Sequence, residues 1–248
     1  MPLVKPPKLP RDVQEHMSRI YEEKVDIYEG LNRAQDYNSD IIKALLKEQD
    51  FRDRVILDLG TGMGKLAIPL ARKSNMVYAL DKSKSMLKVL KKKIESKGIK
   101  NIRIINSGFN ESGLPEESVD VIVSLWAFPT HSDDWERDMK AIRRLLKKDG
   151  SIIIFETVRS GEFHRLSRRV HDKEHNEVFD RFNRDMHEWL KHKGFKRKRT
   201  IDIFCNFKTK KNMEKHFAPF FGHEDAVYFM ARNITSFRIR VAMLVGKK

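Results

Sequence analysis

Seven residues, Asp58-Leu-Gly-Thr-Gly-Met-Gly64, constrain the fold of this chain more than any other stretch. They follow a short apolar run at 55–59 that is typical of a β-strand, and they precede a helical stretch at 65–73 in which Pro69 should cause a bend. Glycine residues at such a junction allow a tight turn and let backbone N–H groups approach a ligand beside the positive end of a helix. The turn therefore predicts a small polar or charged ligand at a strand-to-helix junction.

The following residues alternate between strand and helix signals. Further strands are expected at 76–80, 102–105, 119–125 and 151–157. One helix is expected between a cap at Ser83 and a stop at Gly98, and another at 134–146. Strands that are apolar on both faces and separated by single helices indicate a mostly parallel sheet covered on each side. The sequence therefore predicts an α/β fold.

Two flanking regions depart from this alternation. Residues 1–36 are interpreted as a proline-rich extended arm followed by an amphipathic lid helix at 12–29. Residues 37–248 are interpreted as the main domain, whose first helix is expected to begin near Asn38 or Ser39 as cap. Within that domain, 160–193 is interpreted as a polar helical insert, and strands are expected at 195–207 and 236–245. One face of the insert should carry Val178, Phe182, Met186 and Leu190.

Composition excludes some classes and leaves others open. With 248 residues and 40% hydrophobic content, the chain can bury the core of one globular domain, and it lacks the run of about 18 apolar residues that a membrane span needs. The single cysteine, Cys205, excludes a multi-cysteine metal site, is expected to fill a buried strand and is compatible with a cytoplasmic protein. The net charge of +15 would attract phosphates or anionic surfaces, so RNA stays an open partner.

The spacing around the glycine turn separates three ligand classes. A phosphate-binding P-loop has a glycine, then four residues, then Gly-Lys-Ser/Thr. If Gly64 and Lys65 were the end of such a loop, the first glycine would be Leu59 and the Ser/Thr would be Leu66, so the motif is not present. A dinucleotide site places its third glycine one position later, where this chain has Lys65. Asp58 would repel a pyrophosphate and attract a cation, and Asp81 follows after 23 residues, near the offset at which a carboxylate binds a ribose diol. The turn therefore favours a cationic nucleoside cofactor.

Four segments in this order make the chain similar to a known family. They are 55–64, 81–87, 114–124 and 144–150, and over residues 58–158 the chain resembles class I S-adenosylmethionine-dependent methyltransferases, near the broad group of quinone and sterol methyltransferases. The resemblance implies a Rossmann-like three-layer sandwich, whose seven-stranded, mostly parallel sheet has an antiparallel last strand, with a helical N-terminal lid. It also implies S-adenosylmethionine as cofactor and S-adenosylhomocysteine as product.

The resemblance assigns roles by position. The methionine part of the cofactor would be lined by Gly60, Gly62 and Gly64, its amino group oriented by Asp58 and its ribose held by Asp81, with Thr61 and Lys82 in the same segments. Ser124 would border both cofactor and acceptor. The family usually offers an Asp to the adenine amino group, whereas this chain reads Asn-Ser-Gly-Phe-Asn at 106–110. Backbone groups of Gly108 and Phe109 are expected to replace it, with Asn110 as an acceptor.

The segment after the fourth strand should decide the acceptor. His131 is a candidate general base because its ordinary pKa is near neutrality, although a loop histidine is also often a surface group. Trp126 and Phe128 would wall an acceptor pocket or pack in the core, and Asp133 and Asp134 should cap the next helix. The segment lacks the Asn/Asp-Pro-Pro-aromatic motif of base-amine methyltransferases and the cysteine of cytosine-carbon methyltransferases.

The histidine-rich insert and the basic run at 195–200 have simpler interpretations. Five of the nine histidines lie between 160 and 193 without the spacing of metal ligands, so no metal is expected and a solvated helix explains them. The basic run would begin an edge strand or bind phosphates. The aromatic residues at 217–229 should cover the sheet or line an acceptor site.

The favoured hypothesis is methyl transfer to a small-molecule or lipid-like acceptor, based on the aromatic segment after the fourth strand and the helical lid. The alternatives are an RNA methyltransferase that uses the basic surface, a protein that binds S-adenosylmethionine without turnover, and a nicotinamide dehydrogenase.

Overall fold

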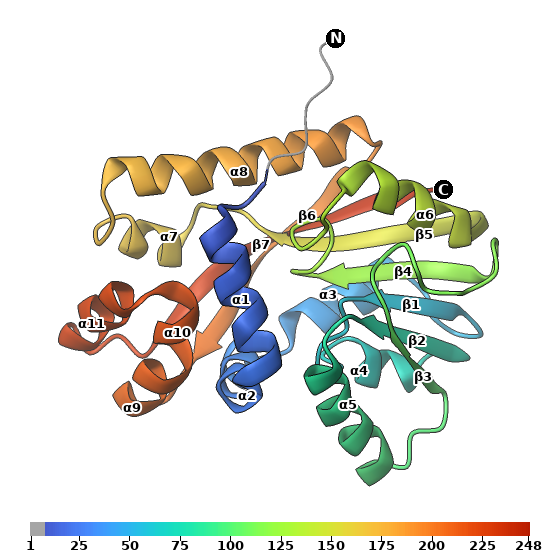
Figure 1. Cartoon of the computed structure of the whole chain (residues 1–248), viewed down its shortest axis with the longest axis horizontal. Helices are drawn as coiled ribbons and strands as arrows, with labels where there is room; N and C mark the ends of the chain where they lie inside the picture. Colours follow the sequence, from blue (N-terminus) through green and yellow to red (C-terminus); the bar gives the residue numbers. More distant parts are fainter. Residues whose placement is uncertain (1–7) are drawn as a thin grey trace.

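The computed structural model describes residues 8–248, so the start of the expected N-terminal arm at 1–7 lies outside the described residues. Its centre is one seven-stranded sheet in the order β3-β2-β1-β4-β5-β7-β6 (Figure 1). The strands are β1 (Val55–Leu59), β2 (Met76–Asp81), β3 (Ile102–Asn106), β4 (Val119–Leu125), β5 (Leu146–Thr157), β6 (Lys196–Asn206) and β7 (Ser236–Lys247).

Strand directions confirm the expected mixed sheet. Neighbouring strands from β3 to β5 pair in parallel, whereas β7 is antiparallel to both β5 and β6. In the centre, Asp58 of β1 is level with Ala79 of β2 and Val123 of β4. The carboxyl ends of the parallel strands therefore meet at one edge, where α/β sheets bind ligands.

Helices cover both faces and complete the three layers. On one face lie α3 (Asp40–Glu48), α4 (Ala67–Ala71) and α5 (Lys84–Ser96), and on the other α6 (Trp135–Leu145) and α8 (Lys173–His192) (Figure 1). Each face has its own cluster of buried apolar side chains, with Leu90 of α5 in the first and Trp189 of α8 in the second. The sheet is apolar on both sides because both sides are covered.

The N-terminal helix expected at 12–29 is two helices, α1 (Arg11–Glu23) and α2 (Val25–Ala34), which are separated at Lys24. The break changes the direction of the chain, and it brings the Tyr21 and Tyr28 rings edge to face at 5.2 Å. Next, α3 begins after Ser39 as expected, but Asp36 accepts the hydrogen bonds from the first N–H groups, at 2.6 Å from Asp40 N. Figure 1 shows α1 and α2 beside the carboxyl ends of the parallel strands.

Three features of the C-terminal half differ from the sequence prediction. β5 begins at Leu146, five residues before the expected start, because a bulge lets it pair with Val119. The insert contains a short helix, α7 (Glu162–Ser167), before α8. Val178 is 40% exposed rather than inward, and the buried face of α8 consists of Phe182, Met186, Trp189 and Leu190.

The aromatic C-terminal segment covers the sheet, as predicted. It consists of α9 (Lys210–Asn212), a π-helical turn (Met213–Phe217), α10 (Ala218–Phe221) and α11 (His223–Ala231), and it buries Phe217 and Phe229. Cys205 is buried in β6, as expected. Within residues 8–248, no helix combines the length and apolarity needed to cross a bilayer.

Candidate active site

The glycine turn is closed by the carboxylate that precedes it. Asp58, the penultimate residue of β1, is buried, and the Thr61 hydroxyl donates a 2.7 Å hydrogen bond to it. Burial raises the pKa of the Asp58 carboxyl to about 7. Gly60 has a φ of +67°, and a Cβ atom there would lie 2.2 Å from the Cβ of Ala127. Only glycine fits at this point, because both the conformation and the space exclude a side chain.

The second carboxylate joins the turn to the end of β2. Asp81 accepts hydrogen bonds from the backbone N–H of Gly62 at 2.8 Å and of Ser83 at 2.9 Å. Burial raises the pKa of Asp81, and the charge of Asp81 contributes to the raised pKa of Asp58. The two carboxylates that the sequence singled out therefore lie close together, one on each side of the glycine turn.

Gly64, the third glycine of the turn, packs against apolar side chains of α4 and α5. Gly64 is absent from the walls of the cavities around the turn, and a Cβ there would meet Leu90 Cδ1 at 2.5 Å and Ile68 at 3.1 Å. Gly64 lets α4 and α5 pack against the turn. The prediction that it lines the methionine part of a cofactor stays a prediction, and the packing of Leu90 and Ile68 is a second reason for a glycine at this position.

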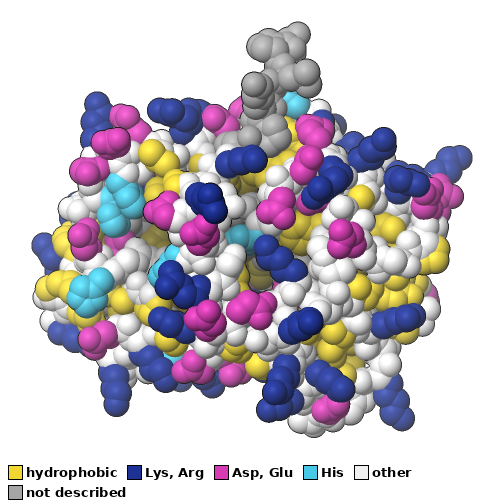
Figure 2. Space-filling model, viewed as in Figure 1, with side chains coloured by type: hydrophobic (Ala, Val, Ile, Leu, Met, Phe, Trp, Pro, Cys, Tyr) yellow, Lys and Arg dark blue, Asp and Glu magenta, His cyan; other side chains and the backbone are white. Residues whose placement is uncertain are grey.

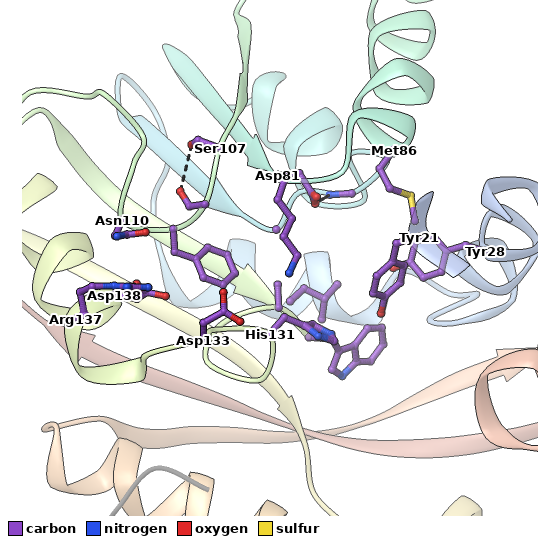
Figure 3. Close-up of a pocket in the computed structure, with 18 residues that line it drawn as sticks. Tyr21, Tyr28, Asp81, Met86, Ser107, Asn110, His131, Asp133, Arg137 and Asp138 are labelled. Carbon is purple, nitrogen blue, oxygen red and sulfur yellow. Dashed lines mark hydrogen bonds and ion pairs between the residues drawn. The ribbon is translucent and has the colours of Figure 1, made fainter. Parts of the chain in front are cut away.

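A first cavity extends from the glycine turn along the ends of β2, β3 and β4 (Figure 3). Asp81 lies between two groups of side chains, with Ser107 and Asn110 on one side and the two lid tyrosines on the other. The predicted residues that line this cavity are Gly60, Gly62, Asp81, Lys82, Gly108, Phe109 and Asn110, with Trp126 and His131 from the acceptor segment.

Residues 107–110, in the segment where the sequence differs from the usual family pattern, form one wall of the first cavity. The Asn106 amide donates to the backbone carbonyls of Asp81 and Lys82 at 3.0 and 2.9 Å, which holds the two strand ends together. The Phe109 ring packs edge-on against Phe128 at 5.5 Å and lines the cavity. An aromatic ring and the neighbouring backbone thus occupy the region where the family resemblance places the adenine.

The lid contributes two residues that the sequence prediction missed. Tyr21 of α1 and Tyr28 of α2 line the first cavity, and burial raises the pKa of both phenols. The lid is attached to the turn by Lys65, whose ammonium donates to the carbonyls of Asn32 and Gln35. The sequence indicated an amphipathic segment with an inward face, but it did not indicate that this face lies over the first cavity.

The segment after β4 divides between core and cavity. Ser124 is fully buried: its hydroxyl donates to the carbonyl of Leu59 at 3.3 Å and accepts from the N–H of Phe128 at 2.9 Å. Ser124 thus joins the end of β1 to the segment after β4, and its expected place beside the ligands stays a prediction. Phe128 is also core, whereas Trp126 lines the first cavity, and its buried indole N–H has no hydrogen-bond partner within residues 8–248.

His131 lines both the first cavity and the second, larger cavity described below. Its ring lies edge-on to Tyr21 at 5.7 Å, and burial lowers the pKa of the imidazole to about 4. The imidazole is therefore neutral near neutral pH and a weak base. Asp134 caps α6 as predicted, accepting from the N–H groups of Glu136 and Arg137, whereas Asp133 lines the first cavity instead.

A second, larger cavity of about 860 Å³ adjoins the first. The two share Tyr21, Tyr28, Trp126 and His131, so these four side chains form the boundary between them. Phe, Tyr and Trp side chains form part of the wall of the second cavity, and Glu156 near the end of β5 is a buried carboxylate in it. The sequence prediction did not single out Glu156, which appears there as the end of an apolar strand.

Of the five histidines of the insert, His175 and His192 are exposed, as expected for a solvated helix, whereas His164 is buried. His164, His171 and His175 line the second cavity, and the rings of His171 and His175 stack at 4.1 Å. His171 Nε2 lies 2.6 Å from the Asp225 carboxylate, because the insert packs against α11 across the cavity. Among residues 8–248, no group of His, Cys, Asp and Glu has the geometry of a metal site.

Comparisons with known proteins find similarity to methyltransferases. Residues 56–150 match a family model described as a methyltransferase domain. An uncharacterized methyltransferase of Geobacillus sp. (strain WCH70) is 31% identical over 104 residues, which are 42% of this chain and 47% of that protein. A demethylmenaquinone methyltransferase of Geobacillus kaustophilus is 29% identical over 104 residues, 41% of this chain and 44% of that protein. The matched region thus spans about half the length of these relatives.

Solved structures share the fold over most of the chain. A SAM-dependent methyltransferase from Aquifex aeolicus has a TM-score of 0.54 at 16% identity, covering 96% of this chain and 99% of that one. A geranyl diphosphate C-methyltransferase from Streptomyces coelicolor has a TM-score of 0.54 at 12% identity, covering 84% of this chain and 75% of that one. Residues 56–150 therefore form a methyltransferase domain, and the chain shares its fold with solved methyltransferase structures.

Proposed function

We propose that this protein transfers the methyl group of S-adenosylmethionine to a small-molecule acceptor that binds in the second cavity. The observation that carries the proposal is the common boundary of the two cavities, formed by Tyr21, Tyr28, Trp126 and His131. A cofactor in the first cavity and an acceptor in the second would meet at these side chains. Positioning two reactants in this way supplies much of the rate enhancement of a displacement reaction.

The residues around the first cavity fit the cofactor chemically. Two carboxylates beside the turn suit a ligand that carries an ammonium, a sulfonium and a ribose diol, because each of these groups is a cation or a hydrogen-bond donor. Asp81 would hold the ribose, Asp58 would attract the amino group, and the wall formed by Gly108 and Phe109 would face the adenine. When bound, the cofactor supplies an electrophilic methyl group on a positively charged sulfur.

The second cavity supports a small and mostly apolar acceptor. Its aromatic lining suits a ligand body of low polarity. Two of the similar proteins are named a demethylmenaquinone methyltransferase and a geranyl diphosphate C-methyltransferase, and both names point to small-molecule acceptors. The net charge of +15 keeps RNA as the second candidate, although on the face seen in Figure 2 Lys and Arg are interspersed with Asp and Glu.

A labelled-methyl screen tests the proposal. The protein is incubated with methyl-labelled S-adenosylmethionine and either a small-molecule and lipid extract or purified RNA. We expect label in the extract, with little dependence on salt. Label in RNA that falls steeply as salt rises would instead favour the RNA methyltransferase. Tight S-adenosylhomocysteine binding without transfer to either sample would indicate a binding protein without turnover, and preferential binding of NADH would indicate a dehydrogenase.

A further inference from the structure

Glu156 is an unusual carboxylate for the wall of an apolar cavity. It lies next to the end of β5, its side chain is part of the second cavity, and it is 4% exposed. The Thr130 hydroxyl donates a 3.0 Å hydrogen bond to Glu156 Oε1. Across residues 8–248, no Lys, Arg or His side chain forms an ion pair with it. A buried carboxylate without a cation is unfavourable, so its retention calls for an explanation in function.

The surroundings of Glu156 favour a cationic ligand. Its charge helps to raise the pKa of Tyr21, one of the four boundary residues, which places Glu156 near the junction of the two cavities. Trp126 and Tyr28 line the same junction. A carboxylate and several aromatic rings around one space form the environment that attracts an alkylammonium group, through charge pairing and cation–π contact. A neutral alcohol would gain neither interaction.

We propose that Glu156 is a catalytic residue that binds the ammonium group of a primary or secondary amine and removes one of its protons, so that the methyl acceptor is an amine on an apolar body. This inference rests on the proposed function of the two cavities. Thr130 acts as a positioning residue, because its hydroxyl holds one oxygen of the Glu156 carboxylate.

The proton and electron balance is complete without another reactant. The ammonium gives one proton to the Glu156 carboxylate, and the free amine lone pair then attacks the methyl carbon. The nitrogen–carbon bond forms while the sulfur–carbon bond breaks, and the electron pair of the broken bond stays on sulfur. The product leaves as a methylated ammonium, and Glu156 releases its proton to water.

The other titratable groups around the cavity are less suited than Glu156 to accept a proton from the ammonium. Burial lowers the pKa of His131 and of His164 to about 4, so both are poor proton acceptors near neutral pH. Tyr21 and Tyr28 have raised pKa values and stay protonated. Arg159 is paired with Asp180, and Asp225 with His171. Burial raises the pKa of Glu156 to about 8, which lets it exchange a proton with an amine near neutrality.

Calorimetry on the complex with S-adenosylhomocysteine tests this without turnover. The probes are 2-phenylethylamine, hexylamine and their matched alcohols, each titrated at about pH 6.5 in two buffers of different ionisation enthalpy. At that pH the free Glu156 is protonated, so binding of an ammonium should release about one proton, whereas an alcohol should release none. We expect the amines to bind about tenfold tighter than the alcohols. Equal affinity, or amine binding without proton release, would overturn the proposal.

Two variants assign the effect to this side chain. Glu156→Gln should remove both the amine preference and the proton release, and Glu156→Asp, which keeps the charge, should retain part of each. If Glu156→Gln fails to fold, Glu156→Asp and the proton count of the unmodified protein decide the question. An amine preference that survives in folded Glu156→Gln would overturn the assignment.

Turnover separates a failure of this inference from a failure of the proposed function. Absent S-adenosylhomocysteine formation with every small molecule would refute the proposed function, whatever the calorimetry shows. Methylation of alcohols or carbon acids in preference to amines would refute only the role of Glu156. With amine acceptors, we expect Glu156→Gln to lower kcat at least about 100-fold.

Discussion

The carboxylate of Asp81 accepts a 2.8 Å hydrogen bond from the backbone N–H of Gly62, so the end of β2 supports the glycine turn that follows β1. The same carboxylate accepts from the N–H of Ser83, where α5 begins. One side chain thus connects the two strand ends and a helix N-terminus around the first cavity. It therefore fixes the orientation of the turn.

Replacement of Asp81 should weaken cofactor binding. We expect Asp81→Ala to reduce the affinity for S-adenosylhomocysteine by on the order of 1–3 kcal/mol, because charge-assisted hydrogen bonds to the ribose and the support of Gly62 are both lost. Isothermal titration calorimetry measures the change, and circular dichroism checks that the variant folds. Asp149→Ala, which removes an exposed carboxylate, is the control. Unchanged affinity in Asp81→Ala would contradict the ribose assignment.

Replacement of Gly60 should destabilise the fold for a steric reason. Gly60 and Gly98 have similar φ values of +67° and +63°, but an added Cβ at Gly60 lies 2.2 Å from Ala127 Cβ, whereas Gly98 has no atom within 4 Å. Gly60→Ala should therefore lose about 1–3 kcal/mol more of the unfolding free energy than Gly98→Ala, the matched control for backbone conformation. Urea unfolding of both variants measures this difference. Equal losses would mean that Ala127 moves aside.

The buried Glu156 should make stability fall as pH rises. Its pKa is raised from 4.5 to about 8 in the folded protein, so between these values the folded state binds more protons than the unfolded state. The stability that Glu156 contributes is present below the unfolded pKa and is lost as pH approaches the folded one. Relative to Glu156→Gln, the unmodified protein should lose on the order of 3 kcal/mol between about pH 5 and pH 8.

Urea unfolding at both pH values measures this difference. The variant is compared with the unmodified protein because the pKa of Asp58 is also raised by burial, and its contribution has the same sign in both proteins. Parallel pH dependences in the two proteins would show that Glu156 is ionised in the folded state.

Local patterns were sufficient to predict the sheet and the two carboxylates. The strand that has Asp58 as its penultimate residue and the strand that ends at Asp81 are apolar runs next to turn residues, and parallel strands place their ends side by side. The role of Gly64 was not predictable in this way, because a glycine near a ligand and a glycine against a helix have the same local sequence. Only the position of Leu90 distinguishes the two.

The acceptor side of the site depends on contacts between distant segments. Tyr21 and Glu156 are 135 residues apart in the sequence, and neither belongs to a motif. They approach each other because α1 packs over the carboxyl ends of the strands, which no local pattern specifies. Likewise, the histidines of the insert are polar residues on a helix in the sequence, whereas in the fold α11 and the insert enclose a cavity between them.

The two candidate proton acceptors, His131 and Glu156, should differ in their pH profiles. The pKa of His131 is about 4 and that of Glu156 about 8, so only Glu156 titrates in the range where the amine reaction is measured. For kcat/KM with an amine acceptor, we expect a rise with an inflection near pH 8 in the unmodified protein. The inflection should persist in His131→Gln, with a loss of less than about tenfold, and disappear in Glu156→Gln. Initial rates from about pH 5 to pH 9 measure both profiles, with S-adenosylhomocysteine affinity as the check that each variant still binds the cofactor. If His131→Gln abolishes the inflection while Glu156→Gln keeps it, His131 is the base and the first interpretation of the sequence holds.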